Sequence, residues 1–267
     1  MSTMITDCPV SDFMSTPVAT IHLDASLADA ERRLEDGTFS SLAVTDGSGE
    51  LCGVLSRTDL LRIGRLRATM AEDPKLLTLP HQLVRMRMTR DVVTAQPTDS
   101  LREAAAAMLE HHIHRVFVVD RGRPVGVLST RDLMRAVVAA RLAQPLSHWM
   151  SSPVVTVNVS ERVGVATDLL HASRVRGLVV EEGEWPVGVF TQKEAIASAT
   201  LDAGTPVEEV MSCALLCLPT TLPLFRAAAF ALQTQARRIL VVSSRELQGI
   251  VSGLDMACAV AADRSPA

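Results

Sequence analysis

A short pattern with chemical potential occurs four times in the chain. It consists of a glycine, two apolar residues, a serine or threonine and, three residues later, a carboxylate. The four copies are Gly53-Val-Leu-Ser56-Arg-Thr-Asp59, Gly126-Val-Leu-Ser129-Thr-Arg-Asp132, Gly188-Val-Phe-Thr191-Gln-Lys-Glu194 and Gly249-Ile-Val-Ser252-Gly-Leu-Asp255. A hydroxyl in the first turn of a helix lies beside backbone N–H groups that attract an anion such as phosphate. A carboxylate one turn on can accept two hydrogen bonds from the vicinal diol of a sugar. The pattern therefore predicts contacts to phosphate and to a sugar.

The same spacing also describes a capping box, in which the acid accepts a hydrogen bond from the backbone of the cap residue. Ser26-x-x-Asp29 and Ser100-x-x-Glu103 are predicted to be boxes of this kind. For one isolated motif the two interpretations are about equally supported. Glutamate is the usual capping partner and aspartate is shorter. We therefore expect the three aspartates to contact a ligand, and Glu194 to keep the cap and to weaken the sugar contact.

A second marker shows that the pattern belongs to a repeat. A methionine followed six residues later by Thr or Cys occurs as Met14/Thr20, Met88/Thr94, Met150/Thr156 and Met211/Cys217. The methionine precedes the motif glycine by 38 residues in three copies and by 39 in the first. Two markers in register four times indicate an internal repeat. The first repeat is followed by a predicted linker, Thr69 to Pro80.

Each repeat is predicted to have the order β-α-β-β-α, which makes the fold class α/β (α+β). The expected strands include 18–23, 92–95, 116–119, 154–159 and 239–242, and the expected helices include 26–35, 100–111, 160–172 and 222–234. The predicted repeats span 8–68, 82–142, 144–201 and 205–262. A unit this small cannot cover its own apolar sheet face, so repeats should pair into modules 1–143 and 144–267.

Composition excludes several classes of protein. Hydrophobic residues make up 48% and charged residues 21%, which is typical of a globular chain. The net charge of −4 and the aromatic content of 3% disfavour nucleic-acid binding. The five cysteines form no CxxC pair and are expected to be reduced. We expect no membrane segment, because no apolar run approaches about 20 residues. We also expect a cytoplasmic location.

The repeat and its motif resemble the CBS domain, named for cystathionine β-synthase, and the resemblance covers nearly the whole chain. Two CBS domains pair into a Bateman module. Four in one chain are similar to stand-alone bacterial proteins and to the gamma subunit of AMP-activated protein kinase. The resemblance implies adenine nucleotides (AMP, ADP or ATP), less often S-adenosylmethionine, bound in clefts between paired repeats. It implies that the aspartate holds the ribose hydroxyls, that the Ser/Thr and a following residue lie near phosphate, and that the early threonine lines the base pocket.

Repeat two is the most complete candidate site, and the first module is the favoured binder. Its predicted ligand residues are Thr94, His114, Arg115, Ser129, Thr130, Arg131 and Asp132. Repeat one offers Thr20, Ser56, Arg57 and Asp59, and repeat four offers Arg237, Arg238, Ser252 and Asp255. Weak or degenerate positions are Thr156, Thr191, Glu194 and Cys217. His114, Arg115, Arg237 and Arg238 could instead stabilise helix C-termini.

We therefore expect a non-catalytic sensor with the pseudo-symmetric disk of paired Bateman modules, which signals nucleotide levels by changing conformation. No nucleophile–base pair, Walker loop or metal set is evident, and His111-His112-x-His114 has no acidic or cysteine partner nearby. No prosthetic group is expected, and whether Mg²⁺ accompanies the nucleotide is left open. An unidentified effector protein should read the signal, and homodimerisation is open. The alternatives are an S-adenosylmethionine-binding protein and a ligand-free interaction scaffold.

Overall fold

The computed structural model describes residues 7–37, 39–68, 79–173, 175–198, 201–244 and 246–262. Of the predicted linker, Thr69 to Pro80, residues 69–78 lie outside the described residues. The chain divides into two compact units, Asp7–Asp132 and the part from Leu133 onward. This division falls inside helix α4 (Thr130–Ala140), earlier than the predicted boundary after Ala143.

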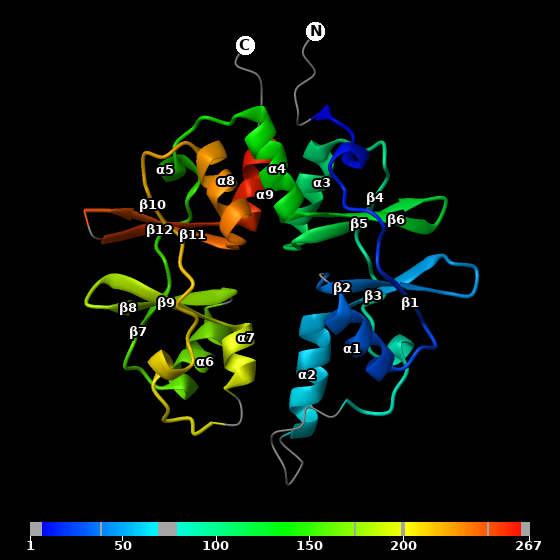
Figure 1. The fold of residues 1–267 in the computed structure, drawn as a ribbon, viewed down its shortest axis with the longest axis horizontal. Helices are drawn as coiled ribbons and strands as arrows, with labels where there is room; N and C mark the ends of the chain where they lie inside the picture. Colours follow the sequence, from blue (N-terminus) through cyan, green and yellow to red (C-terminus); the bar gives the residue numbers. More distant parts are fainter. Residues whose placement is uncertain are drawn as a thin grey trace. The chain divides into compact units, whose positions relative to one another are not determined.

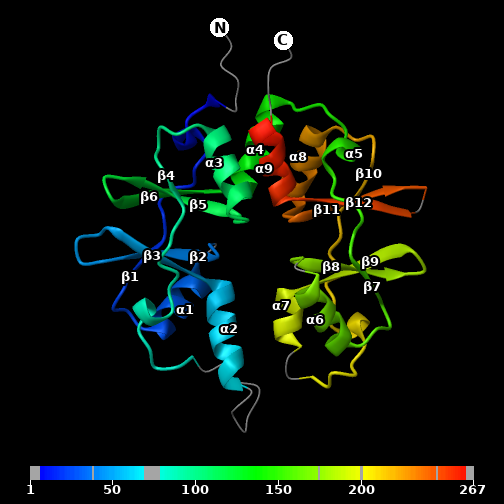
Figure 2. The ribbon, with the colours of Figure 1, turned by 180° about the vertical axis from the view of Figure 1, so that it is seen from behind.

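The first unit contains two repeats with the same sheet topology. Repeat one comprises β1 (Thr20–His22), α1 (Leu27–Asp36), β2 (Ser41–Thr45), β3 (Leu51–Ser56) and α2 (Arg57–Ala68). Repeat two comprises β4 (Thr94–Ala95), α3 (Leu101–Glu110), β5 (Arg115–Asp120), β6 (Arg123–Ser129) and the start of α4. In each sheet the middle strand pairs parallel with the first strand and antiparallel with the third. The two sheets lie one above the other, with α1 and α2 beyond one and α3 beyond the other (Figure 1, Figure 2).

The second unit repeats this arrangement. Its first repeat comprises α5 (Leu146–Trp149), β7 (Thr156–Asn158), α6 (Val163–Ala172), β8 (Gly177–Glu182), β9 (Trp185–Thr191) and α7 (Gln192–Ala197). Its second comprises β10 (Cys217–Pro219), α8 (Leu224–Thr234), β11 (Arg238–Ser243), β12 (Glu246–Ser252) and α9 (Gly253–Ala262). The four three-stranded sheets confirm the predicted mixed α/β class, and each predicted repeat range contains one sheet.

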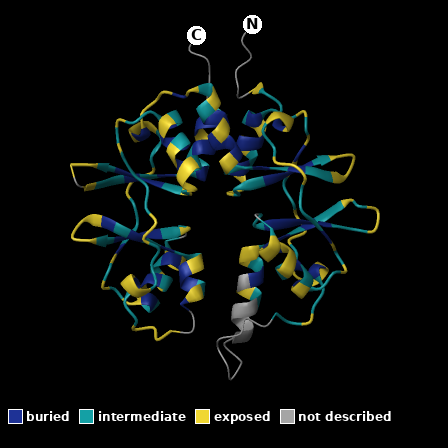
Figure 3. Ribbon diagram, viewed as in Figure 1, coloured by how far each residue is buried: buried dark blue, intermediate teal, exposed yellow. Residues whose placement is uncertain are grey.

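The middle strands are almost continuously buried, because helices cover one face of each sheet and the neighbouring sheet of the same unit covers the other. Three consecutive residues are buried in β5, β8 and β11, and four in β2. Buried positions follow the strands, whereas exposed ones gather at the hairpin tips (Figure 3). The third strands alternate near their ends, as expected of a half-covered strand.

The predicted elements agree with the structure to within a few residues, except at the start of α6. The sequence predicted a helix from Ser160, but α6 begins at Val163 after Arg162. The Ser160 hydroxyl and backbone N–H both donate to the side-chain oxygen of Asn158. This Asx turn satisfies Ser160 locally and delays the helix.

A segment before each first strand crosses to the other repeat of its unit. We call these segments the arms; they are residues 9–15, 83–89, 145–151 and 206–212. The arm of repeat one pairs with repeat two at Pro9–Ser100 and Ser15–Val127, and the arm of repeat two pairs with repeat one at Ser26–Leu83 and Val54–Thr89. The second unit shows the same exchange. Each arm also contributes one fully buried side chain: Val10, Val84, Leu146 and Val207.

The exchange explains why the methionine and glycine markers occur together. Each marker methionine packs on the motif glycine of the partner repeat, not on that of its own. Met14 lies on Gly126, Met88 on Gly53, Met150 on Gly249 and Met211 on Gly188. A Cβ atom on Gly249 would lie 2.7 Å from the Met150 Sδ and 3.0 Å from its Cβ. The glycine is therefore required by close approach of the partner arm.

The two predicted capping boxes are confirmed and give an expected pH dependence. Ser26 caps α1 with Asp29, and Ser100 caps α3 with Glu103. Hydrogen bonds from Ser26 hold the pKa of Asp29 below its ordinary 3.8, and those from Ser100 hold the pKa of Glu103 below 4.5. A carboxyl whose pKa is lower in the folded state binds more protons when unfolded, so its stabilisation is present above the unfolded pKa and lost as the pH falls through the folded pKa.

We therefore expect Asp29→Asn to lower the free energy of unfolding at pH 7 and to have a smaller effect at pH 3. Urea denaturation of wild type and variant at both pH values measures the difference. An equal cost at the two pH values would show that the carboxylate charge does not stabilise this cap.

No helix in the described ranges is both long and apolar enough to cross a bilayer.

Candidate functional site

All four motif acids cap their own helix, the three aspartates as well as Glu194. The backbone N–H of Ser56 donates to Asp59 at 2.9 Å, and those of Ser129 and Ser252 donate to Asp132 and Asp255 at 2.6 Å. The N–H of Thr191 donates to Glu194 at 3.1 Å. The motif hydroxyl donates to the same carboxylate oxygen in every copy. Aspartate thus reaches the cap as well as glutamate does.

The cap engages one oxygen of each carboxylate, and in two copies the other oxygen meets the partner arm. The Ser15 hydroxyl lies 3.3 Å from Asp132 Oδ1, and the Ser151 hydroxyl lies 2.9 Å from Asp255 Oδ1. Ser15 and Ser151 directly follow the marker methionines Met14 and Met150. The Asp132 side is enclosed, because this residue is only 2% exposed. Donors of this kind offset the cost of burying a polar group.

An arm meets the N-terminus of the helix that follows the motif in the other repeat of its unit. We call each such place a junction and name it after the motif acid of that helix. The Asp132 junction contains the arm of repeat one, and the Asp59 junction contains the arm of repeat two. The Asp255 and Glu194 junctions are arranged likewise in the second unit. Motif and arm therefore come from different repeats, whereas the sequence interpretation grouped them by repeat.

Residues at the start of the middle strand lie beside the motif hydroxyl residue in the Asp132 and Asp255 junctions. Arg115 is the ladder partner of Ser129, and the Thr130 N–H donates to the His114 carbonyl at 3.0 Å. Arg238 is likewise the ladder partner of Ser252. The structure therefore brings together most of the residues predicted for repeat two, namely His114, Arg115, Ser129, Thr130 and Asp132.

The second unit carries a concentration of positive charge at this place. Burial lowers the pKa of Arg238, the positive charge of Arg237 lowers it further, Glu194 opposes this, and Arg176 adds to the lowering. The guanidinium groups of Arg176, Arg237 and Arg238 thus lie near one another, together with the carboxylate of Glu194. Such a place favours a bound anion, which would relieve both the desolvation and the repulsion.

Arg57, predicted to supply charge in repeat one, turns elsewhere. Its guanidinium donates to the Leu34 carbonyl near the end of α1, a position where a cation is favourable. This contact stabilises the helix terminus. Arg131 is exposed in the first turn of α4, next to Asp132.

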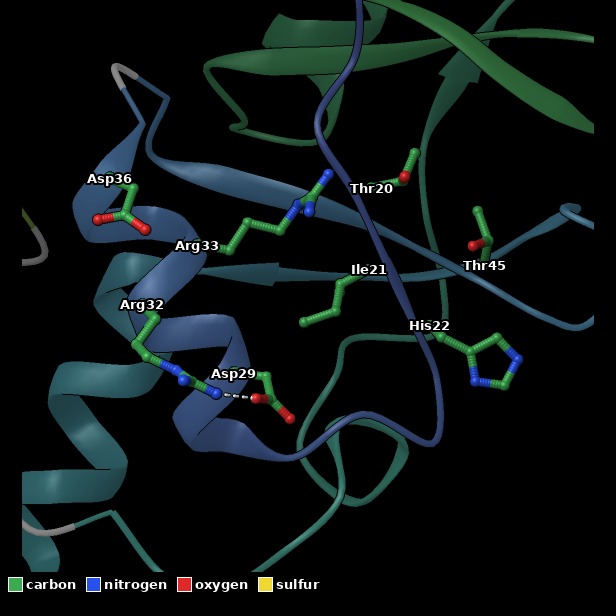
Figure 4. A pocket seen from close by; sticks show the side chains of 8 residues that line it. All are labelled: Thr20, Ile21, His22, Asp29, Arg32, Arg33, Asp36 and Thr45. Atoms are coloured by element: carbon green, nitrogen blue, oxygen red, sulfur yellow. Dashed lines mark hydrogen bonds and ion pairs between the residues drawn. The ribbon is translucent and has the colours of Figure 1, made fainter.

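Thr20 and Thr94 lie in pockets of their own repeats. Thr20 lines a pocket of about 610 Å³ between β1 and α1, together with Thr45, Arg32, Arg33 and others (Figure 4). Thr94 lines one of about 650 Å³ with residues 95–98 and 119–122, at the hairpin end of β5. Neither lining includes a motif acid. Thr94 and Ser129 also lie on opposite edges of one sheet, about 12 Å apart from two strand spacings and an offset of two residues along the strands.

The marker residues of the second unit lie on the first strands of their own repeats. Thr156 begins β7 and pairs with Val179, and Cys217 begins β10 and pairs with Leu240. Burial raises the pKa of the Cys217 thiol, so it remains protonated.

Sequence reasoning missed Ser15 and Ser151. The signal was present, because the residue after each marker methionine is a serine or threonine: Ser15, Thr89, Ser151 and Ser212. Its meaning depends on the arm exchange, which no local pattern reveals. Across the described residues, no three His, Cys, Asp or Glu side chains group as a metal site would require.

Comparison with known proteins agrees with this architecture. The family model for the CBS domain matches residues 10–65, 83–139 and 146–199. Protein MJ1404 of Methanocaldococcus jannaschii is 26% identical over 205 residues, which cover 70% of this chain and 47% of that protein. The chain thus spans about half the length of this relative.

Two solved structures illustrate the range of similarity. Protein MJ1225 of Methanocaldococcus jannaschii shares the fold with a TM-score of 0.77 at 16% identity, covering 94% of this chain and 99% of that one. CBSX2, solved in complex with AMP, is 27% identical with a TM-score of 0.41, covering 49% of this chain and 96% of that one. The family model spans more than half of the chain, and the arms join the repeats two by two. The chain therefore belongs to the CBS-domain family, with its repeats in tandem pairs of the Bateman type.

Proposed function

We propose that the chain is a non-catalytic regulatory protein that binds an adenine nucleotide at the Asp132 and Asp255 junctions. The observation that carries this proposal is the contact of Ser15 with Asp132 and of Ser151 with Asp255. In each case the carboxylate and the helix N-terminus of one repeat meet the arm of the other repeat. The carboxylate suits a ribose diol, and the helix N-terminus with its neighbouring cations suits phosphate.

The Asp59 and Glu194 junctions are weaker candidates. The contact that carries the proposal, an arm serine on the second oxygen of the motif acid, is the one found at Asp132 and Asp255. The proposal therefore places one favoured site in each unit, instead of favouring the first unit alone.

The charge of the site favours a nucleotide over S-adenosylmethionine. The latter carries a positive sulfonium group, which in the second unit Arg176, Arg237 and Arg238 would repel, whereas a phosphate would be attracted. At roughly −0.3 kcal/mol per heavy atom, an AMP-sized ligand gains about −7 kcal/mol, a dissociation constant on the order of 10 μM. A site of this affinity fills and empties as nucleotide levels change.

The arms supply a route for signalling. A ligand that bonds Asp132 must accommodate Ser15, whose arm leads directly into β1 of the other repeat. Binding that changes this contact would alter how the two repeats of a unit meet. It regulates a partner protein if that partner binds the two arrangements with different affinity.

Thermal denaturation with AMP, ATP and S-adenosylmethionine tests the proposal. At a hundredfold excess over the dissociation constant, a ligand that binds only the folded state adds about 2.7 kcal/mol to the free energy of unfolding. We expect a rise of several degrees with AMP or ATP. If the denaturation temperature rises only with S-adenosylmethionine, that molecule is the ligand and the proposed nucleotide is wrong. If it rises with none of the three, the result favours a ligand-free scaffold.

A further inference from the structure

The residues that start the four middle strands differ in a regular way. Each is the ladder partner of a motif hydroxyl residue: Ser41 of Ser56, Arg115 of Ser129, Gly177 of Thr191 and Arg238 of Ser252. In both units the second repeat therefore has an arginine at this position, and the first repeat has a small residue.

In both units the arginine side chain extends to the strand start of the other repeat. Arg115 Nη1 donates to the Ser41 hydroxyl at 2.7 Å. Arg238 Nη2 donates to the Arg176 carbonyl at 2.9 Å, and a Cβ atom on Gly177 would lie 3.2 Å from the same nitrogen. The small residue thus makes room for the guanidinium, whose backbone belongs to one junction and whose charge lies at the other.

We propose that this strand-start arginine, Arg115 or Arg238, is shared by the two junctions of its unit, so that each unit binds one nucleotide and the chain binds two. The inference rests on the proposed nucleotide binding and specifies its stoichiometry.

The physical reason is competition for one cation. A phosphate at the Asp59 junction would meet this guanidinium directly, because Arg115 contacts Ser41 and Ser41 lies one strand spacing of about 5 Å from the motif residue Ser56. A phosphate at the Asp132 junction would compete for the same group, because Arg115 itself is the ladder partner of Ser129. A second phosphate in the unit would lack that partner and would meet the charge of the first. The first ligand therefore excludes the second electrostatically.

Equilibrium dialysis of the full chain with radiolabelled AMP, titrated from about 1 μM to 1 mM, measures the number of sites that fill near the expected dissociation constant of about 10 μM. We expect two AMP per wild-type chain, and one per chain for Arg115→Gln and for Arg238→Gln. The matched control is Arg123→Gln, an exposed arginine at the start of β6, which should leave two. Circular dichroism confirms that each variant is folded.

A second variant tests the contact of the Arg238 side chain with the strand start at Gly177 without removing a charge. Gly177→Ala places a methyl group against the Arg238 guanidinium and should weaken AMP binding to the second unit about tenfold or more.

Three or four AMP per wild-type chain would overturn the sharing and leave nucleotide binding intact. An unchanged stoichiometry in both glutamine variants, or normal affinity in Gly177→Ala, would also overturn it. No bound AMP at all would contradict the proposed function itself.

Discussion

Replacing Asp132 by asparagine is expected to weaken AMP binding to the first unit about 10- to 150-fold, while the second unit keeps its affinity. The amide oxygen can still accept the cap hydrogen bond from Ser129, but the amide nitrogen then faces Ser15 and cannot accept from a ribose hydroxyl. Hydrogen bonds to a charged group contribute about 1.5–3 kcal/mol, which corresponds to this loss. Titration calorimetry should resolve one weakened site beside one normal site.

Asp29→Asn is the matched control, because Asp29 makes the same cap at α1 but belongs to no junction. It should lower stability without changing AMP affinity. Glu194→Gln should change AMP binding less than Asp132→Asn does. Equal affinities for wild type and Asp132→Asn would show that this carboxylate serves only its helix.

The second large effect concerns the packing of arms on partner repeats. Gly249→Val should lower the free energy of unfolding by about 1–3 kcal/mol, because the added carbons overlap Met150. Met150→Ala alone should cost about 1–2 kcal/mol, less than a fully buried methionine would, because Met150 is half-buried. The double variant should cost less than the sum by about 0.5–3 kcal/mol, because removal of the methionine side chain makes room for valine. Guanidinium denaturation measures all four proteins.

Gly47→Ala provides the control, since a Cβ atom there would meet nothing within 4 Å. It should change stability by less than about 0.5 kcal/mol. Additive costs for Gly249→Val and Met150→Ala would contradict the contact between the two markers.

Local features were predictable because neighbouring residues determine them. The helices beginning at Leu27 and Leu101 follow from their capping boxes, and the middle strands follow from runs of branched apolar residues. The repeat itself was visible in two markers kept in register. These signals require only short stretches of sequence, and the comparisons confirm the family that they indicated.

The composition of the site was not predictable, because it depends on contacts between repeats. A constant separation between Met88 and Gly126 suggested that they act within one repeat, yet each packs on a residue of the other repeat. Residue type alone does not separate capping from ligand binding, since the aspartates reach the cap as Glu194 does. The crossing of Arg115 to Ser41 has no sequence signature beyond a small residue at the matching position.

A crystal structure of the full chain with millimolar AMP tests the central claim most directly. The account predicts one AMP in each unit, with its ribose hydroxyls bonded to Asp132 beside Ser15 and to Asp255 beside Ser151. AMP bound instead in the pockets lined by Thr20 or Thr94, or junctions that contain only solvent, would contradict it.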